Sequence, residues 1–455
     1  MKNSSLTQFL KTRGLLLILL LAFVIRIGFF VSLQPWNKEV VDKAIIVSDG
    51  IGYHHLALSL LSKKSFEDFD AFRTPGYPLF VALMYGISAG SVWFVLLIQI
   101  FLNLISVLLV YKIALTLFSR KIALLSAFLF AIDIHQALFA VTLLTDTFFV
   151  FLFLASVLYL CKSIKENDFS SLCLSALFLG ISTLVRPISF LFPLVAVIFI
   201  LVLCRLTLKM RLVYALVFGL IFIIAISPWL IHNYAKYGEA KLSSISGYNL
   251  LFYNVAYTEV YKTGKTIEQV TGEFNALAIK QGIDTTDRYL FKNSTIYADI
   301  AHRYIKDNFI LYCKRHLMGI VNMYAGIGIP HITAIFHLES KPVIADQFAG
   351  PGIFTRIRNY FSSRTAAEIL ITYGLGLYLF IIYLFSLSGI FILVKRRERF
   401  VFLFILIILY FSALTGVVGS VRYRIPIMPF FDILCAVGLL PLYEKIMDKF
   451  SRVKI

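Results

Sequence analysis

Charged residues and paired cysteines are scarce in this chain. Only 15% of its 455 residues are charged, whereas 59% are hydrophobic, and the mean hydropathy is +0.85. Soluble globular domains carry about 25% charged residues, so this composition excludes an ordinary soluble domain. The five cysteines are scattered and include no Cys-x-x-Cys pair, which indicates neither a disulfide framework nor a zinc site.

Acidic residues are also few, and the chain is strongly basic, with 43 Lys and Arg against 25 Asp and Glu. The high hydropathy argues against nucleic acid as the reason for this excess. Runs of about 18 or more apolar residues are typical of membrane helices. The sequence therefore predicts an all-α polytopic membrane protein with about ten transmembrane helices. The expected spans are 14–33, 91–112, 121–140, 143–161, 170–188, 189–206, 211–231, 369–394, 400–419 and 425–444.

The basic residues between these spans predict the orientation of the chain. Their clusters are 112–121, 162–165, 205–211, 395–399 and 445–454. With ten spans, every cluster falls on the side of the N-terminus, and Lys and Arg are enriched in cytoplasmic loops. We therefore expect a plasma (inner) membrane protein with both termini in the cytoplasm and an uncleaved first helix.

Two apolar segments are expected not to cross the membrane. Residues 309–330 carry Lys314, Arg315 and His316 near their middle, and a crossing there would invert every later loop. We predict an interfacial amphipathic helix on the outer face for this segment. Residues 75–89 are expected to form a helix too short to span.

These assignments divide the chain into three regions. Residues 1–231 form a first transmembrane module that includes the outer loop 34–90. Residues 232–368 form an extracytoplasmic region with interfacial helices, and residues 369–455 hold the C-terminal transmembrane helices.

Several polar residues gather at the outer ends of the predicted spans. They are Asp49, Arg73, Asp146, Arg186, His232, Asn233, Arg422 and Arg424. Ionisable groups at membrane depth are costly and are candidates for function. Other roles remain open: Asp49 and Asp146 could cap helices, the arginines could anchor lipid headgroups, and His54 could be a wall residue.

An acid among arginines at an outer membrane face suits a lipid-phosphate substrate. Glycosyl transfer from a phosphate-linked sugar needs a base that deprotonates the attacking hydroxyl. It also needs positive charge, or a metal ion, where the leaving phosphate develops charge. The two acids could hold a divalent ion, so a metal cofactor is possible, and its ligands are not assigned.

The order of these motifs resembles the GT-C fold glycosyltransferases that use polyprenyl-phosphate sugars. More narrowly, the chain is similar to the protein mannosyltransferase and aminoarabinose-lipid A transferase superfamily. The motifs that carry the resemblance are Asp49-x3-Tyr53, Arg73-Thr-Pro-Gly-Tyr77, Leu144-Thr-Asp146, Leu184-Val-Arg186-Pro, Trp229-x3-Asn233 and Arg422-Tyr-Arg424.

The resemblance implies roles for individual residues. It places the catalytic base at Asp49, a second acid of the same cavity at Asp146, and a donor-phosphate contact at Arg186. Tyr53, His54, Arg73, Tyr77, Asn233, Arg422 and Arg424 complete the expected substrate-binding set. Arg73-Thr-Pro stands where aminoarabinose transferases have Glu-Lys-Pro, and His232 stands where many relatives have Arg.

The sequence thus predicts an inverting membrane glycosyltransferase with its active site on the extracytoplasmic face. Its donor would be a polyprenyl-phosphate-linked sugar, and its acceptor a lipid, a glycan or a protein. One alternative is an enzyme of the O-antigen polymerase or ligase type, which would be expected to use arginines and a histidine of the long loop rather than an early aspartate; His302 and His331 are the histidines to test. Another is a transporter of lipid-linked glycans, which predicts inverted repeats and broken helices at the bilayer midplane.

Overall fold

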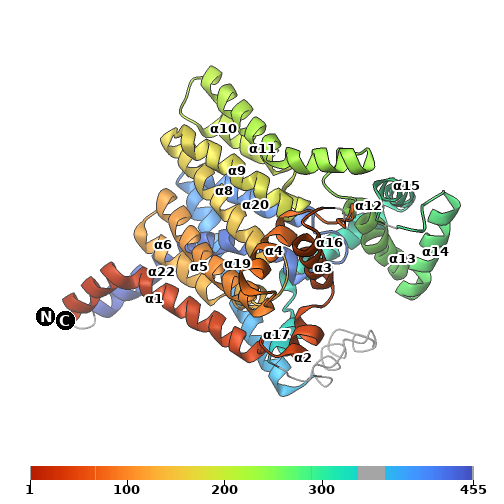
Figure 1. Ribbon diagram of the computed structural model, residues 1–455. Coiled ribbons are helices and arrows are strands. Elements are labelled where there is room, and N and C mark those ends of the chain that lie inside the picture. Colours follow the sequence, from red (N-terminus) through yellow and green to blue (C-terminus); the bar gives the residue numbers. More distant parts are fainter. Residues whose placement is uncertain (1, 67, 288, 337–363, 453–455) are drawn as a thin grey trace.

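A computed structural model describes residues 2–66, 68–287, 289–336 and 364–452, and in these ranges all regular elements are helical. Ten helices form one bundle (Figure 1). They are α1 (Lys2–Leu33), α5 (Val92–Leu117), α6 (Arg120–Ile132), α8 (Asp146–Glu166), α9 (Phe169–Val185), α10 (Phe192–Leu203), α11 (Leu208–Tyr237), α19 (Ala366–Lys395), α20 (Phe400–Ala413) and α22 (Met428–Arg452). A helix satisfies all its backbone polar groups within one segment, so apolar sequences of this kind adopt it in lipid.

A second set of helices gathers at one end of this bundle. They are α2 (Lys38–Val40), η1 (Val41–Ile45), α3 (Asp49–Lys63), α4 (Gly76–Ser88), α7 (Ile134–Ala140), η2 (Pro187–Ser189), α16 (Phe309–Ala325), α17 (Ile329–Ile335) and α21 (Val421–Arg424). We call this the site end. Next to it, α12 (Ile245–Asn249), η3 (Leu250–Val255), α13 (Ala256–Thr263), α14 (Ile267–Lys280) and α15 (Phe291–Asp307) pack around a small core of their own.

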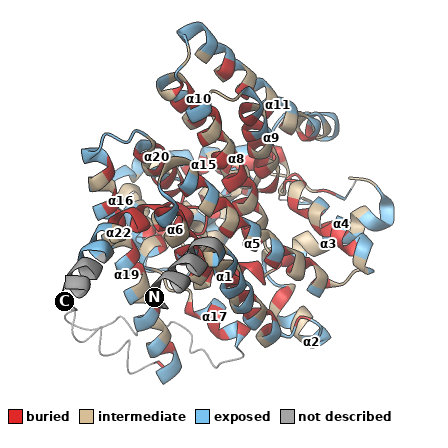
Figure 2. Ribbon diagram, turned by 90° about the vertical axis from the view of Figure 1, so that its left-hand side faces the viewer, coloured by how far each residue is buried: buried red, intermediate tan, exposed pale blue. Residues whose placement is uncertain are grey.

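Helix α8 lies at the centre of the bundle, where buried residues dominate (Figure 2). In its most apolar stretch 78% of the residues are buried, against 22% in α1 and 28% in α11. Helices α5 and α9 pack on α8, and α11 packs on the far side of α9. Any polar group at the start of α8 is therefore removed from solvent.

Every predicted span coincides with a helix, but a count of ten spans is not confirmed. Six helices are long and apolar enough to cross a membrane, and eight are if two bent pairs count as one span each. Four of the expected spans are shorter apolar helices: Phe169–Val185, Pro187–Leu203, Phe400–Ala413 and Met428–Leu442. A fifth, α6 with α7, bends by 58° at Asp133, because the Asp133 side chain accepts hydrogen bonds from the first backbone amides of α7.

The end of the bundle opposite the site end collects both chain termini. Lys121 at the start of α6 pairs with Glu444 near the end of α22, at 2.6 Å. The Tyr214 hydroxyl of α11 donates to the Asn167 carbonyl at the end of α8, at 2.8 Å. Helix α1 begins beside α22, as Figure 1 shows. The start of α1 and the last turns of α22 therefore lie at the same end of the bundle.

Helices α16 and α17 contact other helices at the site end. The Tyr324 and Ser412 hydroxyls lie 2.6 Å apart near the end of α20, and a His135 ring nitrogen of α7 lies 2.8 Å from the Ile327 carbonyl oxygen. Farther along, Phe336 packs on Phe29 near the end of α1. Residues Phe309–Ile335 are long and apolar enough to span, which differs from the predicted interfacial helix. Their partners nevertheless favour a path across the helix ends.

This path can be tested by cysteine labelling in a variant without the native cysteines. Lys306→Cys lies just before α16 and Ala334→Cys lies in the last turn of α17, and both positions are exposed. We expect a membrane-impermeant thiol reagent to label both in intact cells, and to leave Glu398→Cys at the opposite end unlabelled. Labelling of only one of the first two positions would mean that this segment crosses the membrane.

Candidate functional site

The site is organised around the buried carboxylate of Asp146. Asp146 is the first residue of α8, and its side chain is fully buried. A carboxylate in such a place is very costly unless cations or donors satisfy both of its oxygens. Two arginines from distant parts of the sequence do this.

Arg186 supplies the first cation. It follows the last residue of α9 and has extended backbone angles, φ −141° and ψ 116°, because the residue before a proline is disfavoured in a helix. Its guanidinium leaves the helix axis there and donates to Asp146 Oδ1. The same group lies over the ring of Phe149, 5.6 Å from the ring centre, which adds a cation–π contact.

Arg422 supplies the second cation and joins both acids. Its Nε donates to Asp146 Oδ2 at 2.8 Å, and its Nη1 donates to Asp49 Oδ2 at 2.7 Å. Burial alone would lower the pKa of Arg422, but the carboxylates of Asp146 and Asp49 outweigh this effect and raise it. The guanidinium therefore keeps its charge although only 21% of the side chain is exposed.

Asp49 is the open end of this arrangement. Its side chain is 44% exposed, in contrast to the fully buried side chain of Asp146. Asp49 starts α3, where the helix dipole favours a negative group. Ser48 before it has φ 51° and ψ −125°, a conformation that non-glycine residues rarely adopt. This strained turn starts α3 at Asp49, whose carboxylate meets Arg422.

Together Asp49, Arg422, Asp146 and Arg186 form a chain of alternating charge, which we call the ion chain. Asp49 and Asp146 do not act as helix caps, because the N-cap residues are Ser48 and Thr145. Sequence analysis placed all four charged residues on one face, and the structure brings them into contact. It gave no role to Thr145, whose hydroxyl lies 3.5 Å from Arg422 Nη2.

Arg73 and two tyrosines border the ion chain. The Arg73 guanidinium lies 5.6 Å from the ring centre of Tyr53, which is one helical turn after Asp49. A Cβ at Gly52 would lie 2.4 Å from the Arg73 Cζ, so glycine is needed for this approach. Asp70, which the sequence analysis missed, orients Arg73 by accepting its backbone amide at 3.0 Å. The Asp-x-x-Arg spacing is a local turn signal that could have revealed it.

The turn that carries Arg73 is fixed on the end of α9. The Thr74 hydroxyl donates to the Val185 carbonyl at 3.3 Å, next to Arg186. A Cβ at Gly76 would lie 2.7 Å from the Leu184 carbonyl oxygen, so only glycine fits there. Tyr77, one residue on, packs edge-to-face on Tyr53 with ring centres 4.9 Å apart. Two of the predicted basic groups, Arg73 and Arg186, therefore lie where the turn before α4 packs on the end of α9.

Three predicted site residues point elsewhere. His54 Nδ1 lies 2.8 Å from the Tyr85 hydroxyl of α4. Asn233 is buried and donates to the Lys241 carbonyl at 2.6 Å, so it shapes the chain after α11. Arg424 is fully buried and donates to the carbonyls of Met323 and Tyr324. None of these three joins the ion chain by a hydrogen bond that the described part of the structure contains.

Loss of one charge in the buried part of the ion chain should destabilise the protein. Asp146→Asn leaves Arg186 and Arg422 without their shared counter-charge, and breaking a buried ion pair in this way costs about 3 kcal/mol. We expect a clear fall in the thermal unfolding temperature in detergent. Asp68→Asn is the control, since Asp68 is an exposed acid paired with Lys63. Equal unfolding temperatures for the two variants would contradict a structural role of Asp146.

The sequence and the fold were compared with known proteins. Residues 73–232 match the family model of dolichyl-phosphate-mannose-protein mannosyltransferase, a segment that includes Arg73, Tyr77, Asp146 and Arg186. No curated protein sequence matches the chain.

The fold is similar to that of the oligosaccharyltransferase AglB from Archaeoglobus fulgidus. In complex with an inhibitory peptide and a dolichol-phosphate, AglB matches with a TM-score of 0.54 and 14% identity, covering 98% of this chain and 52% of AglB. The apo form matches with a TM-score of 0.55 and 13% identity, covering 97% and 52%. This chain therefore spans about half the length of AglB.

A lower similarity, with a TM-score of 0.43 and 12% identity, is found to ArnT from Cupriavidus metallidurans bound to undecaprenyl phosphate, covering 94% of this chain and 78% of ArnT. The predicted GT-C fold is confirmed by the likeness to AglB and by the helical architecture. The chain is a multi-pass membrane protein of the GT-C fold, and its residues 73–232 match the dolichyl-phosphate-mannose-protein mannosyltransferase family.

Proposed function

We propose that this protein is an inverting glycosyltransferase that moves a sugar from a polyprenyl-phosphate carrier to an extracytoplasmic acceptor. The observation that carries the proposal is the ion chain. In it the half-exposed carboxylate of Asp49 lies beside the Arg422 guanidinium, which is also paired with the buried Asp146. The match of residues 73–232 to a mannosyltransferase family supports the same class of reaction.

Asp49 is the base in this proposal. Its Oδ2 accepts from Arg422, and its Oδ1 has no hydrogen bond within the described ranges, so one oxygen is available to an acceptor hydroxyl. A base must lie within hydrogen-bond reach of the proton that it removes. With 44% of its side chain exposed, Asp49 meets this requirement better than the buried Asp146 does.

Asp146 acts as a positioning residue in this scheme. Both of its oxygens are engaged, one by Arg186 and one by Arg422. The Asp146 carboxylate therefore holds the guanidinium groups of Arg186 and Arg422 at fixed positions. Preorganised positive charge of this kind stabilises a leaving group without reorganisation during the reaction.

The leaving phosphate is assigned to the arginines around Asp49. Arg186, Arg422 and Arg73 are each partly exposed, with side-chain exposures of 13%, 21% and 17%. Guanidinium groups bind phosphate oxygens through planar, often bidentate hydrogen bonds. The AglB structure with a dolichol-phosphate supports a lipid-phosphate donor by analogy of fold. The acceptor remains any hydroxyl-bearing lipid, glycan or protein at the extracytoplasmic face.

A divalent metal ion fits these residues poorly. The two acids of the site share Arg422, which occupies the position between them. In the described part of the chain, no group of three or more His, Cys, Asp or Glu side chains is close enough to bind a metal ion. The proposed reaction is therefore assigned to side chains alone.

The base role predicts a large loss of activity in Asp49→Asn. The amide cannot accept the proton of the acceptor, and removal of a general base typically costs about 100- to 10,000-fold in rate. The measurement is transfer of label from a polyprenyl-phosphate sugar in membranes that contain equal amounts of each variant. Asp68→Asn, an exposed acid in the same outer segment, should keep wild-type activity.

The same Asp49→Asn variant separates the alternatives when transfer of label and movement of intact lipid-linked glycan are both measured. A polymerase or ligase that works through loop histidines would lose activity in His302→Ala or His331→Ala and keep it in Asp49→Asn. A transporter would move intact lipid-linked glycan across the membrane whether or not Asp49 is present. Turnover at the wild-type rate by well-expressed Asp49→Asn would refute the assignment of the base.

A further inference from the structure

Arg422 is carried by a helix that is too short to hold itself in place. Helix α21 has four residues, Val421–Arg424, and isolated helices shorter than about 12 residues are marginal in water. Besides the hydrogen bonds of Arg422 itself, the position of α21 therefore depends on contacts made by neighbouring residues. Two buried side chains, Arg424 and Gln136, make these contacts.

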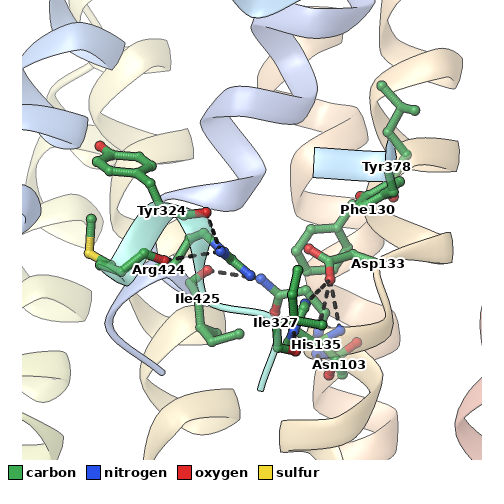
Figure 3. A network of polar contacts seen from close by, with 12 residues as sticks. Asn103, Phe130, Asp133, His135, Tyr324, Ile327, Tyr378, Arg424 and Ile425 are labelled. Carbon is green, nitrogen blue, oxygen red and sulfur yellow. Dashed lines mark hydrogen bonds and ion pairs between the residues drawn. The ribbon is translucent and has the colours of Figure 1, made fainter. Parts of the chain in front are cut away.

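Arg424 joins α21 to the last turn of α16. Its Nη1 donates to the Tyr324 carbonyl at 2.7 Å and to the Met323 carbonyl at 3.0 Å (Figure 3). The Tyr383 hydroxyl of α19 donates to the same Tyr324 carbonyl at 3.0 Å, which ties this turn to the bundle. Arg424 is fully buried, so these contacts are shielded from water.

Gln136 joins α21 to α7. Its Nε2 donates to the Ile425 carbonyl at 2.9 Å, directly after α21. Gln136 is itself held by Asp133, whose Oδ1 accepts the backbone amides of His135 at 2.8 Å and of Gln136 at 3.4 Å (Figure 3). His135 continues the contact surface, with its Nε2 at 2.8 Å from the Ile327 carbonyl oxygen.

We propose that Arg424 and Gln136 are positioning residues for Arg422, and we call this pair the α21 anchor. The hydrogen bonds of Arg424 and Gln136 fix α21 and the residue after it to α16 and α7. The Arg422 side chain extends from the same helix to the ion chain. The inference rests on the proposed function, because the anchor would orient the Arg422 guanidinium toward the donor phosphate. A misplacement of about 1 Å at a reacting centre can lower the rate about 100-fold.

The chain offers a matched control for the loss of a buried arginine. Arg26 of α1 is also fully buried; it donates to Asn103 Oδ1 at 2.8 Å and to the Ala131 carbonyl at 2.5 Å. These partners belong to α5 and α6, and in the described residues no hydrogen bond of Arg26 reaches α21. Asn103 also donates to the Gln136 backbone carbonyl at 3.3 Å, so Arg26 is linked to the anchor indirectly. Arg26→Gln nevertheless leaves in place the side-chain bonds of Arg424 to Tyr324 and of Gln136 to Ile425.

The test compares Arg424→Gln, Arg424→Lys, Gln136→Leu and Arg26→Gln in the full chain. For Arg424→Gln we expect kcat/KM for the polyprenyl-phosphate sugar to fall about 10- to 100-fold, in line with the loss of a charge-assisted hydrogen bond. Arg424→Lys, which keeps a charged donor, should recover part of this loss. Gln136→Leu should lower kcat/KM in the same direction, and Arg26→Gln should leave it near the wild-type value at equal protein level.

Hydrogen exchange provides a readout that does not depend on activity. Peptides covering 420–427 and 322–328 should exchange faster in Arg424→Gln and Gln136→Leu than in the wild type or in Arg26→Gln. Unchanged exchange there, or equal losses of kcat/KM in Arg26→Gln and Arg424→Gln, would overturn the proposal. A wild-type protein that transfers no sugar would refute the proposed function, and the exchange pattern would still decide whether the anchor holds α21.

Discussion

The buried carboxylate of Asp146 is the constraint around which the site end is arranged. A negative charge at the start of the most enclosed span has to be neutralised, and the chain brings two arginines to it from the ends of other helices. Proline after Arg186 ends α9 at the right level, and the turn before α4 packs on that same helix end. Local sequence features far from each other thus serve one electrostatic requirement.

The arrangement also places the two acids in different environments. Asp146 is buried and doubly paired, which makes it a fixed counter-charge, whereas Asp49 is half-exposed and paired on one side. Arg422 pairs with both acids, so the environment of the half-exposed Asp49 carboxylate depends on the buried Asp146 carboxylate. Environment rather than residue type distinguishes the two aspartates, as in other pairs of carboxylates with distinct surroundings.

Much of this site follows from the sequence, because topology places polar residues at the same membrane depth and face. Asp49, Asp146, Arg186 and Arg422 lie at one predicted depth and face, and their contact is observed. The membrane depth of a residue does not reveal the direction in which its side chain points, however. Arg422 and Arg424 share four residues of helix, yet residues two apart on a helix do not face each other, and Arg424 turns into the protein. Asn233 and His54 differ from expectation for the same reason.

The fold was predictable as an all-helical bundle with its termini at one end, but the number of spans was not. Hydropathy measures how apolar a segment is and does not reveal where a helix breaks. The bend at Asp133 depends on a side-chain cap, and the path of α16 depends on partners that are remote in sequence. The cap at Asp133 is a local feature that hydropathy does not register, whereas the path of α16 is set by tertiary contacts that no local pattern specifies.

The separation of the paired residues along the chain also sets an order for assembly during synthesis. Asp146 and Arg186 are 40 positions apart and can meet once α8 and α9 have been inserted. Asp49 has to wait for Arg422, which follows it by 373 positions. A ribosome-bound intermediate therefore carries an incomplete site until α21 has been made, because Asp49 lacks its Arg422 partner before then.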